Sequence, residues 1–424
     1  MSLAWSEWTD DRSDVQLVAG FVAAIWLGMA LFAALVGGPD WPNLAANFVG
    51  RVTILIGAYA LLTLALNIQW GYTGLFNIGV AGFMAVGAYT TAIMTAPVDP
   101  GTGGVPGFGL PLWLGLIGGM VAAALVGALA ALPALRLEAD YLAIVTVALS
   151  EIIRLFVNWQ GVQHVSVAGV EFGTGGGTGI RFAAPNDVVR GLVQGPLGFL
   201  VDALGALGVS GPNVVNIAYG LSLLAVVAAV YWVLDRLASS PFGRVLKAIR
   251  EDETVTQALG KDTRLFKVKA FMIGCALMGL AGVLFRGQGG YIAPGQFRPI
   301  ITFYVFAALI IGGSGSNTGS ILGAATFTAV LFYFPARLGE NLPYAGRGAP
   351  GNVVDALGPL SALDPGPLVA YTLSNVSLLR FVLIGVVIVW VMQNRPEGLL
   401  GHRVEPAASV DLDRSAVTGG DDDE

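Results

Sequence analysis

The stretch RLASSPFGRVLKAIREDETVTQALGKDTRLFKVK, residues 236–269, is a strongly polar segment set between apolar runs of a 424-residue chain. It contains all four lysines of the chain and eight of its 22 basic residues. Positive charge concentrated between apolar segments is typical of a cytoplasmic loop of a membrane protein. The stretch therefore predicts a membrane fold and the side of the membrane on which this loop lies.

Composition agrees with a membrane fold. Apolar residues make up 55% of the sequence and charged residues only 12%, with a mean hydropathy of +0.72, whereas soluble proteins carry roughly 25% charged residues. Several apolar runs approach the roughly 20 residues that cross about 30 Å of hydrocarbon as a helix, while membrane β-strands would be shorter and would alternate. We predict an all-α polytopic transmembrane helical bundle of about 10 spans (8–10), with broken or re-entrant segments.

Alternation of the spans across the membrane fixes a topology. The predicted spans are 17–36, 52–70, 74–95, 110–134, 141–159, 214–234, 269–286, 300–312, 319–335 and 377–394. If the basic loop is cytoplasmic, both termini are cytoplasmic too, and the inner segments hold thirteen basic residues against six in the outer ones. The parts are an N-terminus at 1–16, a transmembrane domain at 17–394 with a cytoplasmic loop at 236–268 and external loops at 160–213 and 336–376, and an acidic tail at 395–424. The two external loops either meet an external partner or are flexible connections.

A helix should begin in the cytoplasmic loop at Ser240 and Pro241, a capping residue followed by the residue best tolerated in a first turn. Apolar and charged residues then alternate at helical spacing, and Gly260 offers a stop. By periodicity alone, this amphipathic helix either lies on anionic lipid or docks a partner protein. The residues in question are Phe242, Arg244, Leu246, Ile249, Arg250, Glu251, Gln257, Ala258, Leu259 and Gly260.

Residues 248–260, AIREDETVTQALG, resemble the cytoplasmic loop of ABC importer permeases, whose short helix ends in glycine and docks into the ATPase subunit. Gln257 stands where that family commonly has glutamate, which removes one charge from the expected contact. The resemblance extends, in order, to the permease family of branched-chain amino acid ABC importers, which is related to urea and short-amide ABC permeases. The matching segments are WGYTGLFNIG (70–79), GAY (87–89), LRL (135–137) with DYLAIVT (140–146) and EIIR (151–154), TGG (174–176) with GI (179–180), IGGSGS (311–316) with Gly319, and RPEGLLG (395–401).

The resemblance implies a transport subunit rather than an enzyme. It implies that the chain forms a translocation path in the cell membrane with a second, related permease, receives solute from an extracytoplasmic solute-binding protein and couples to two cytoplasmic ATP-binding subunits. No cofactor is implied. A nucleotide loop of the Walker type needs a lysine before its Ser or Thr, and no lysine follows Lys269. ATP hydrolysis is therefore expected in separate subunits.

Two Gly-rich segments, 71–79 and 312–320, are best interpreted as broken or re-entrant helices. Unwound backbone inside a bundle offers free N–H and C=O groups, which suit the carboxylate and ammonium of an amino acid. The same small residues also allow tight helix packing. The candidates for the translocation path are Thr73, Asn77, Ser314, Ser316 and Asn317.

Glu151 and Arg154 stand three residues apart inside one predicted span, close enough to pair on a helix. Charges at this depth usually face protein or water. We interpret them as a self-neutralising pair that locks two helices, with direct substrate contact and proton coupling as alternatives. Proton coupling would suit the rival hypothesis, an ion-coupled secondary transporter.

Other kinds of site find little support in the sequence. His164 and His402 are far apart and lack acidic or cysteine companions, so no metal site is predicted. The single cysteine, Cys275, lies in an apolar segment and is expected to pack there. No nucleophile, base and acid are grouped as catalysis requires, and the basic loop lacks the interleaved aromatic residues that bind nucleic acid.

Overall fold

The structure, a computed structural model, describes residues 13–101, 104–134, 139–341, 350–362, 364–395 and 397–399. Three predictions fall mainly outside the described residues. They concern the N-terminal segment before residue 13, the motif around Arg136, and the acidic tail from residue 400 onward.

Helices occupy all ten of the predicted spans. They are α2 (Asp14–Val36), α3 (Trp41–Leu66), α4 (Val80–Thr95), α5 (Leu112–Ala134), α6 (Ala139–Asn158), α9 (Gly211–Ser239), α12 (Thr263–Arg286), α13 (Ile300–Gly312), α14 (Asn317–Ala325) continued by η6 (Thr326–Tyr333) and α15 (Phe334–Asn341), and α18 (Val376–Asn394). Within the described residues, eight helices are long and apolar enough to cross a membrane, and α4 and most of α18 are shorter apolar helices. The predicted helical membrane bundle is confirmed.

The connections are short helices and two small hairpins. They are η1 (Gly38–Asp40), η2 (Asn67–Gly71), η3 (Gln160–Val162), β1 (Val165–Val167), β2 (Val170–Phe172), η4 (Gly176–Thr178), β3 (Ile180–Arg181), α7 (Pro185–Gln194), α8 (Gly198–Ala206), α10 (Pro241–Glu251), α11 (Glu253–Ala258), β4 (Tyr291–Ile292), η5 (Pro294–Gln296), α16 (Val353–Leu357), η7 (Gly358–Ala362) and α17 (Gly366–Ser374). Strand β1 pairs with β2, and β3 pairs with the distant β4, both antiparallel. The segment 160–213 is therefore folded rather than a structureless connection, and its helices α7 and α8 are bent by 75° to each other.

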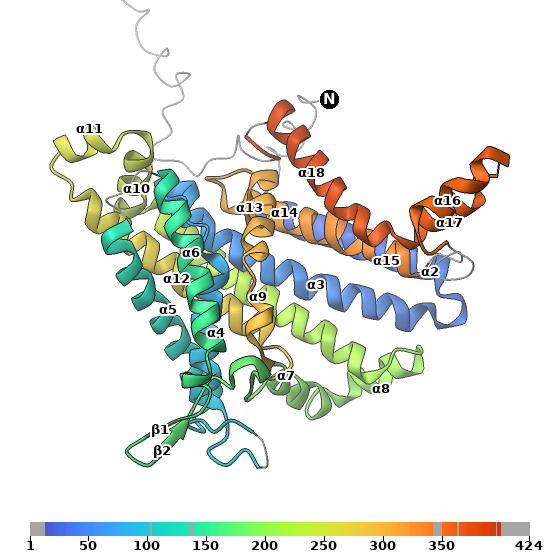
Figure 1. Cartoon of the computed structure of the whole chain (residues 1–424), viewed down its shortest axis with the longest axis horizontal. Coiled ribbons are helices and arrows are strands. Elements are labelled where there is room, and N and C mark those ends of the chain that lie inside the picture. The colour runs from blue at the N-terminus through green and yellow to red at the C-terminus, as the bar shows by residue number, and fades with distance from the viewer. Residues whose placement is uncertain are drawn as a thin grey trace, which may run out of the picture.

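Helix α3 is the centre of the bundle. Of its most apolar stretch, 83% is buried, and it packs against α2, α9, α12, α13 and α14 (Figure 1). It begins at Trp41, so the predicted start at residue 52 is wrong. The predicted span begins just after Arg51, whereas this arginine lies within the helix. A charged side chain does not by itself end a helix, and the backbone of α3 stays helical on both sides of Arg51.

Glycines let α4, α5 and α12 approach one another closely. A Cβ atom on Gly87 of α4 would lie 2.3 Å from the Cα of Gly279 on α12, and one on Gly119 of α5 would lie 2.6 Å from the carbonyl oxygen of Gly87. Contacts between small residues of this kind are typical of packed membrane helices, because lipid gives no hydrophobic drive for association.

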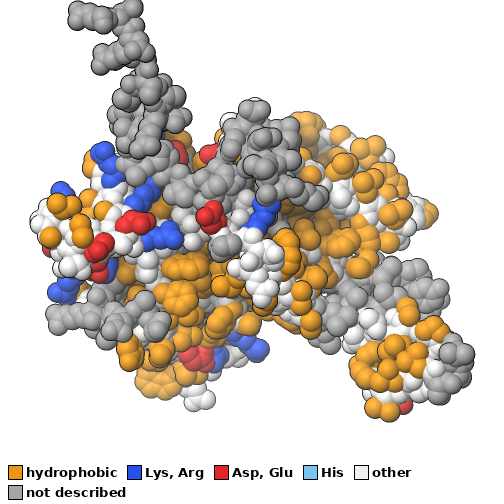
Figure 2. All heavy atoms as spheres, turned by 90° about the horizontal axis from the view of Figure 1, so that it is seen from above, with side chains coloured by type: hydrophobic (Ala, Val, Ile, Leu, Met, Phe, Trp, Pro, Cys, Tyr) orange, Lys and Arg blue, Asp and Glu red, His pale blue; other side chains and the backbone are white. Residues whose placement is uncertain are grey.

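Apolar and charged side chains are segregated on the outer surface. Hydrophobic side chains cover much of the described surface in Figure 2, while Lys, Arg, Asp and Glu gather at the end that carries α10 and α11. Large apolar residues on α5, α6 and α9 are exposed, among them Leu129, Ile152 and Trp232. An apolar belt with a charged end is the surface expected of a protein that lies in lipid with one wet face.

Candidate functional site

Two short helices, rather than the single predicted one, form the polar loop between α9 and α12. Ser240 caps α10 by accepting a hydrogen bond from the Gly243 N–H, and Pro241 is its first residue, so the predicted start is confirmed. Asp252 has an extended backbone, with φ −156°, and its side chain caps α11 by accepting from the Val255 N–H at 3.0 Å. This second capping residue ends one helix and begins the next, which the apolar periodicity did not reveal.

The apolar face of α10 packs on the bundle. Leu246 is fully buried and Ile249 is 4% exposed. Phe242 stacks on Phe266 at the start of α12, with ring centroids 5.4 Å apart. These three predicted docking residues therefore hold α10 against its own chain. The exposed residues of α10 include Arg244, Arg250 and Glu251.

The segment 253–260 has the opposite character. Val255 is 55% exposed and Leu259 is 75% exposed, although both are apolar. Gln257 and Ala258 are exposed beside them. Gly260 adopts φ +79°, a conformation that favours glycine and turns the chain back toward α12. This exposed apolar tip is defined here as the loop tip, residues 253–260.

An ion pair anchors the loop tip. Glu253 at the start of α11 forms a salt bridge with Lys267 on α12 and accepts a hydrogen bond from the Thr263 hydroxyl at 3.0 Å. Partial burial alone would raise the pKa of Glu253, but the hydrogen bonds and the charge of Lys267 outweigh it and hold the pKa below its ordinary value. The tip is thus tied to the beginning of a membrane helix.

The two predicted breaks meet inside the bundle. The first begins with η2, a π-helical turn at the end of α3, and the second is the turn between α13 and α14. Asn67 bridges them, since its amide donates to the Asn317 side chain at 3.1 Å and its oxygen accepts from the Gly315 N–H at 2.8 Å. Gly313 and Gly315 have φ values of +104° and +97°, so the second turn needs glycine at both positions. We call this meeting point the junction, residues 67–79 and 313–317.

A chain of buried amides supports the first break. Asn77 donates to the Gln69 side chain at 2.9 Å, and Gln69 donates to the Phe271 carbonyl on α12 at the same distance. The Asn77 oxygen in turn accepts from the Gly79 N–H at 2.8 Å. Three elements are therefore joined by neutral side chains that are fully buried. Asn67 and Gln69 were missed by sequence reasoning, although two amides in an apolar helix are a readable signal.

The five path candidates lie in or next to this junction. Thr73, Asn77, Ser316 and Asn317 are at most 4% exposed, and Ser314 is half-buried. Thr73 bonds to the Gln69 carbonyl, and Ser316 caps α14 by accepting from the Gly319 N–H at 3.1 Å. Their hydrogen bonds run to the protein itself. Their part in solute passage stays a prediction.

Arg250 connects the loop to the junction. Its guanidinium, on α10, donates to the backbone carbonyl of Gly71. A Cβ atom added at Gly315 would lie 3.1 Å from Nη1 of the same side chain, so Arg250 lies beside both breaks. The ammonium of the neighbouring Lys247 lies 5.5 Å from the ring centroid of Tyr72. Helix α10 is thus joined by a hydrogen bond to backbone of the junction.

The closing motif of the sequence covers the same place. The Leu399 N–H donates to the Ile311 carbonyl at 2.9 Å, and a Cβ atom on Gly398 would lie 2.4 Å from the Gly313 nitrogen. Pro396, Leu400 and Gly401 of this motif lie outside the described residues. The described part of the closing motif therefore packs against the second break, the turn between α13 and α14.

Glu151 and Arg154 pair with each other within α6. Arg154 Nε donates to Oε2 of Glu151 at 2.9 Å, and a second bond joins the two groups. The side chains are 38% and 24% exposed. Among the described residues, neither binds another helix, so the pair neutralises itself on α6 without joining two helices. The predicted locking of two helices is not what these contacts do.

The described residues contain no cluster of three or more His, Cys, Asp or Glu side chains placed to hold a metal ion. Cys275 is fully buried on α12, next to Gln69 and beside Gly127 of α5. Its surroundings are those of a packing residue.

Comparisons with known proteins agree on one family. Residues 48–337 match the family described as "Branched-chain amino acid transport system / permease component". The chain is 34% identical over 301 residues to the high-affinity branched-chain amino acid transport system permease protein LivM of Escherichia coli K12, covering 69% of this chain and 65% of that relative. It is 26% identical over 312 residues to a probable LivM of Methanocaldococcus jannaschii, covering 68% and 81%.

More distant matches are shorter. The autoinducer 2 import system permease protein LsrC of Photorhabdus laumondii is 31% identical over 128 residues, which cover 28% of this chain. No solved structure matches the chain significantly.

Proposed function

This chain belongs to the branched-chain amino acid transport permease family, and on that premise we propose that it is a membrane permease subunit of an ATP-binding-cassette importer for branched-chain amino acids. The observation that supports coupling is the bond from Arg250 on α10 to the carbonyl of Gly71 in the junction. ATP hydrolysis then lies in two cytoplasmic partner subunits, and solute arrives from an extracytoplasmic binding protein. A second, related permease completes the path.

The loop tip is the part that meets the ATPase. Val255 and Leu259 are exposed apolar side chains on a charged, wet face, which is the pattern of a protein contact rather than of a solvated loop. Glu253 and Lys267 tie the tip to α12. A push on the tip therefore reaches a membrane helix directly.

Helix α10 carries the same motion inward. Its buried face moves with the bundle, and Arg250 passes the displacement to Gly71. Asn67 then links the first break to Gly315 in the second. Because both breaks share these bonds, they shift together, and α13 and α14 change position relative to α3. Broken helices that rearrange as a unit suit alternating access.

Leu259→Asp tests the docking step. The residue is 75% exposed, so the change leaves the fold intact but places a charge in the contact. We expect about tenfold less ATPase to co-purify from native membranes, as for an apolar side chain at the centre of an interface. Val98→Asp is the matched control, since Val98 is 70% exposed on the loop between α4 and α5, at the other end of the bundle. Equal recovery of ATPase with both variants would reject docking through the loop tip.

Arg250→Gln tests transmission. The ATPase should still bind and hydrolyse ATP, while uptake into proteoliposomes falls about tenfold because the bond to Gly71 is gone. Arg244→Gln removes the same charge from the exposed face of the same helix and should transport normally. If the two variants lose uptake equally, the effect belongs to loop charge and not to the Gly71 contact.

The substrate is tested on the purified assembly. Recovery of an ATPase and a second permease with this chain, followed by ATP-driven uptake of leucine, isoleucine or valine, supports the proposal. Uptake of urea or short amides instead would assign the alternative cargo of related permeases. A chain that is recovered alone and moves solute down an ion gradient would be a secondary transporter.

A further inference from the structure

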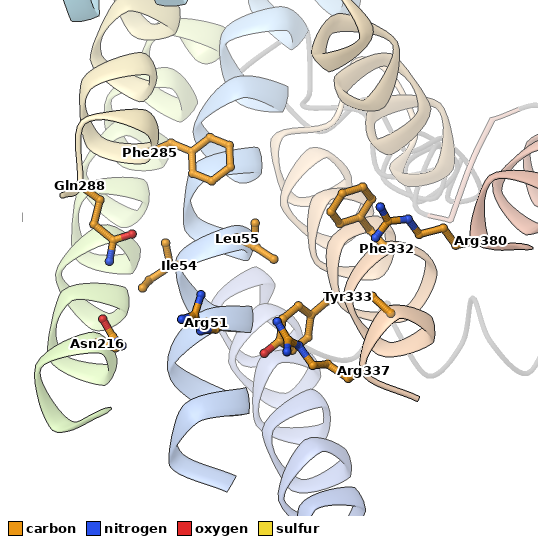
Figure 3. Close-up of a pocket in the computed structure, with 11 residues that line it drawn as sticks. Arg51, Ile54, Leu55, Asn216, Phe285, Gln288, Phe332, Tyr333, Arg337 and Arg380 are labelled. Carbon is orange, nitrogen blue, oxygen red and sulfur yellow. The ribbon is translucent and has the colours of Figure 1, made fainter. Parts of the chain in front are cut away.

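A cavity of about 480 Å³ opens at the far end of the bundle from the loop tip, between α3, α9 and α12 on one side and η6, α15 and α18 on the other (Figure 3). Its lining residues are Arg51, Ile54, Leu55, Asn216, Phe285, Gln288, Phe332, Tyr333, Ala336, Arg337 and Arg380. Arg51 is sixteen positions before Asn67 on the same helix, which at 1.5 Å per residue places the cavity about 24 Å from the junction.

Arginines dominate the charge of this cavity. Arg51, Arg337 and Arg380 line it, and Arg286 follows the lining residue Phe285. No acidic side chain is among the described lining residues.

Three of these guanidinium groups have no carboxylate partner in the part of the chain that the structure describes. Within the described residues, Arg51, Arg286 and Arg380 make no salt bridge, and the buried Nε atoms of Arg286 and Arg380 lack a hydrogen-bond partner. Arg380 lies 4.3 Å from the centroid of the Phe332 ring, and Arg286 lies 4.4 Å from that of Phe285. Aromatic faces stabilise a cation but leave its charge uncompensated.

Uncompensated charge within a membrane bundle is costly, and such residues usually face a water-filled path or a charged ligand. Guanidinium groups bind carboxylates through paired, charge-assisted hydrogen bonds. The cavity is therefore prepared for a negative group.

The remaining lining residues indicate which other chemical groups a ligand of this cavity would carry. Ile54, Leu55, Phe285 and Phe332 give an apolar wall beside the arginines. Asn216 and Gln288 offer amide oxygens that accept from an ammonium group (Figure 3). The volume lies within the roughly 300–1,000 Å³ of ordinary small-molecule sites.

We propose that this cavity is a binding station for a small carboxylate solute with an apolar side chain, its carboxylate attracted by Arg51 and Arg380, which line opposite sides of the cavity (Figure 3), and its side chain packed against Ile54, Leu55 and Phe332. The inference rests on the proposed function, because it names the place where an apolar amino acid waits before the junction opens. Arg286 completes the positive field without lining the cavity.

The first experiment is binding to the purified, full-length chain in nanodiscs. The probes are L-leucine, its carboxylate-free analogue leucinamide, and 4-methylpentanoate, which lacks the ammonium. Leucine and 4-methylpentanoate should bind, and leucinamide should bind at least about tenfold more weakly, since it lacks the group that the arginines recognise. Equal binding of leucinamide would overturn the proposal.

Two variants locate the site. Arg51→Gln and Arg380→Gln should each weaken leucine binding about tenfold, whereas Arg298→Gln, an exposed arginine outside the cavity, should not. Arg51 is exposed, so Arg51→Gln should leave the fold intact and tests the site even if Arg380→Gln disturbs the fold. Unchanged affinity in Arg51→Gln would overturn the assignment.

Uptake and ATPase recovery, measured on the same variants in the whole assembly, separate the two proposals. Normal uptake by Arg51→Gln and Arg380→Gln together with normal leucine binding would reject the cavity and leave the importer intact. Failure of any ATPase to co-purify with the wild-type chain would reject the importer, while carboxylate-dependent binding would still support the cavity. Leucine binding that disappears only when an acidic partner protein is added would show that the arginines pair with that partner instead.

Discussion

The two ends of helix α3 treat polar groups in opposite ways. At one end, the junction holds neutral amides and glycines whose hydrogen bonds are made within the protein, as between Asn67 and Gly315. At the other end, Arg51, Arg286 and Arg380 keep their charges without a carboxylate partner among the described residues. A network whose hydrogen bonds are all made favours one arrangement and moves as a unit. Charged groups without a partner lower their free energy by binding a ligand of opposite charge. The comparison assigns motion to the junction and recognition to the cavity.

Gly71→Ala should disrupt the hydrogen bonds of the junction, and we expect the largest effect from this change. The added Cβ would lie 2.0 Å from Asn67 Oδ1 and 2.8 Å from the Gly315 nitrogen, so the bridge between the breaks must open. Overpacking together with a lost buried hydrogen bond should lower the free energy of unfolding by about 2–4 kcal/mol. Uptake should also fall, because the two breaks would no longer share the bond between Asn67 and Gly315.

Gly385→Ala is the control for this change, because a Cβ on that glycine of α18 would meet nothing within 4 Å. Melting temperature in detergent and uptake in proteoliposomes are the measurements. A Gly71→Ala protein as stable and active as Gly385→Ala would show that the junction is looser than its contacts imply.

Glu151→Gln sharpens the comparison by creating an unpartnered arginine where a pair exists. Arg154 would keep its charge on a membrane helix, and we expect a loss of about 1 kcal/mol, less than for a fully buried pair because both side chains are partly exposed. Yield of folded protein and uptake should fall. The double variant Glu151→Gln with Arg154→Gln should recover both. Loss of uptake in the double variant, with normal yield, would instead indicate direct participation of the pair in transport.

Gln288→Glu tests the cavity by adding a carboxylate to it instead of removing an arginine. A carboxylate in the cavity would give the lone guanidinium groups a partner, so the melting temperature should rise, by the equivalent of about 0.5–1 kcal/mol. Leucine binding should weaken, because the introduced group competes for the same arginines. Gln296→Glu, on η5 outside the cavity, is the control. Unchanged leucine binding in Gln288→Glu would contradict the anionic preference.

Much of this architecture follows from sequence. Ten apolar runs predicted ten helices, and the glycines of 71–79 and 312–320 predicted two breaks, because apolar length and glycine content report directly on local structure. The contact between the breaks did not follow. Asn67 and Gly315 are 248 residues apart, and no local pattern indicates which of two distant turns will face each other.

The cavity shows why charges in a membrane protein are easily misread from sequence. The predicted span 52–70 begins just after Arg51, and Arg337 falls in the predicted external loop 336–376, although both residues lie in helices. Arg286 and Arg380 fell within predicted spans, which is itself a signal of function. What the sequence could not predict is their common location, because Arg51, Arg337 and Arg380, on three different helices, line one cavity only through tertiary packing.

The smallest expected effect concerns Glu253, an ionised group that, unlike the cavity arginines, has its partner. Its folded pKa is depressed below the ordinary 4.5 by Lys267, despite partial burial. The folded state therefore gains stability that is fully present above 4.5 and is lost as the pH falls through the lower folded value. Amide exchange in α11, corrected for the intrinsic rate, should show weaker protection in acid below that value than at neutral pH. Glu253→Gln should lose protection at neutral pH and with it most of the dependence on pH. If both proteins respond to acid alike, the loop tip is not held by this pair, and a partner pushing on it would reach α12 by another contact.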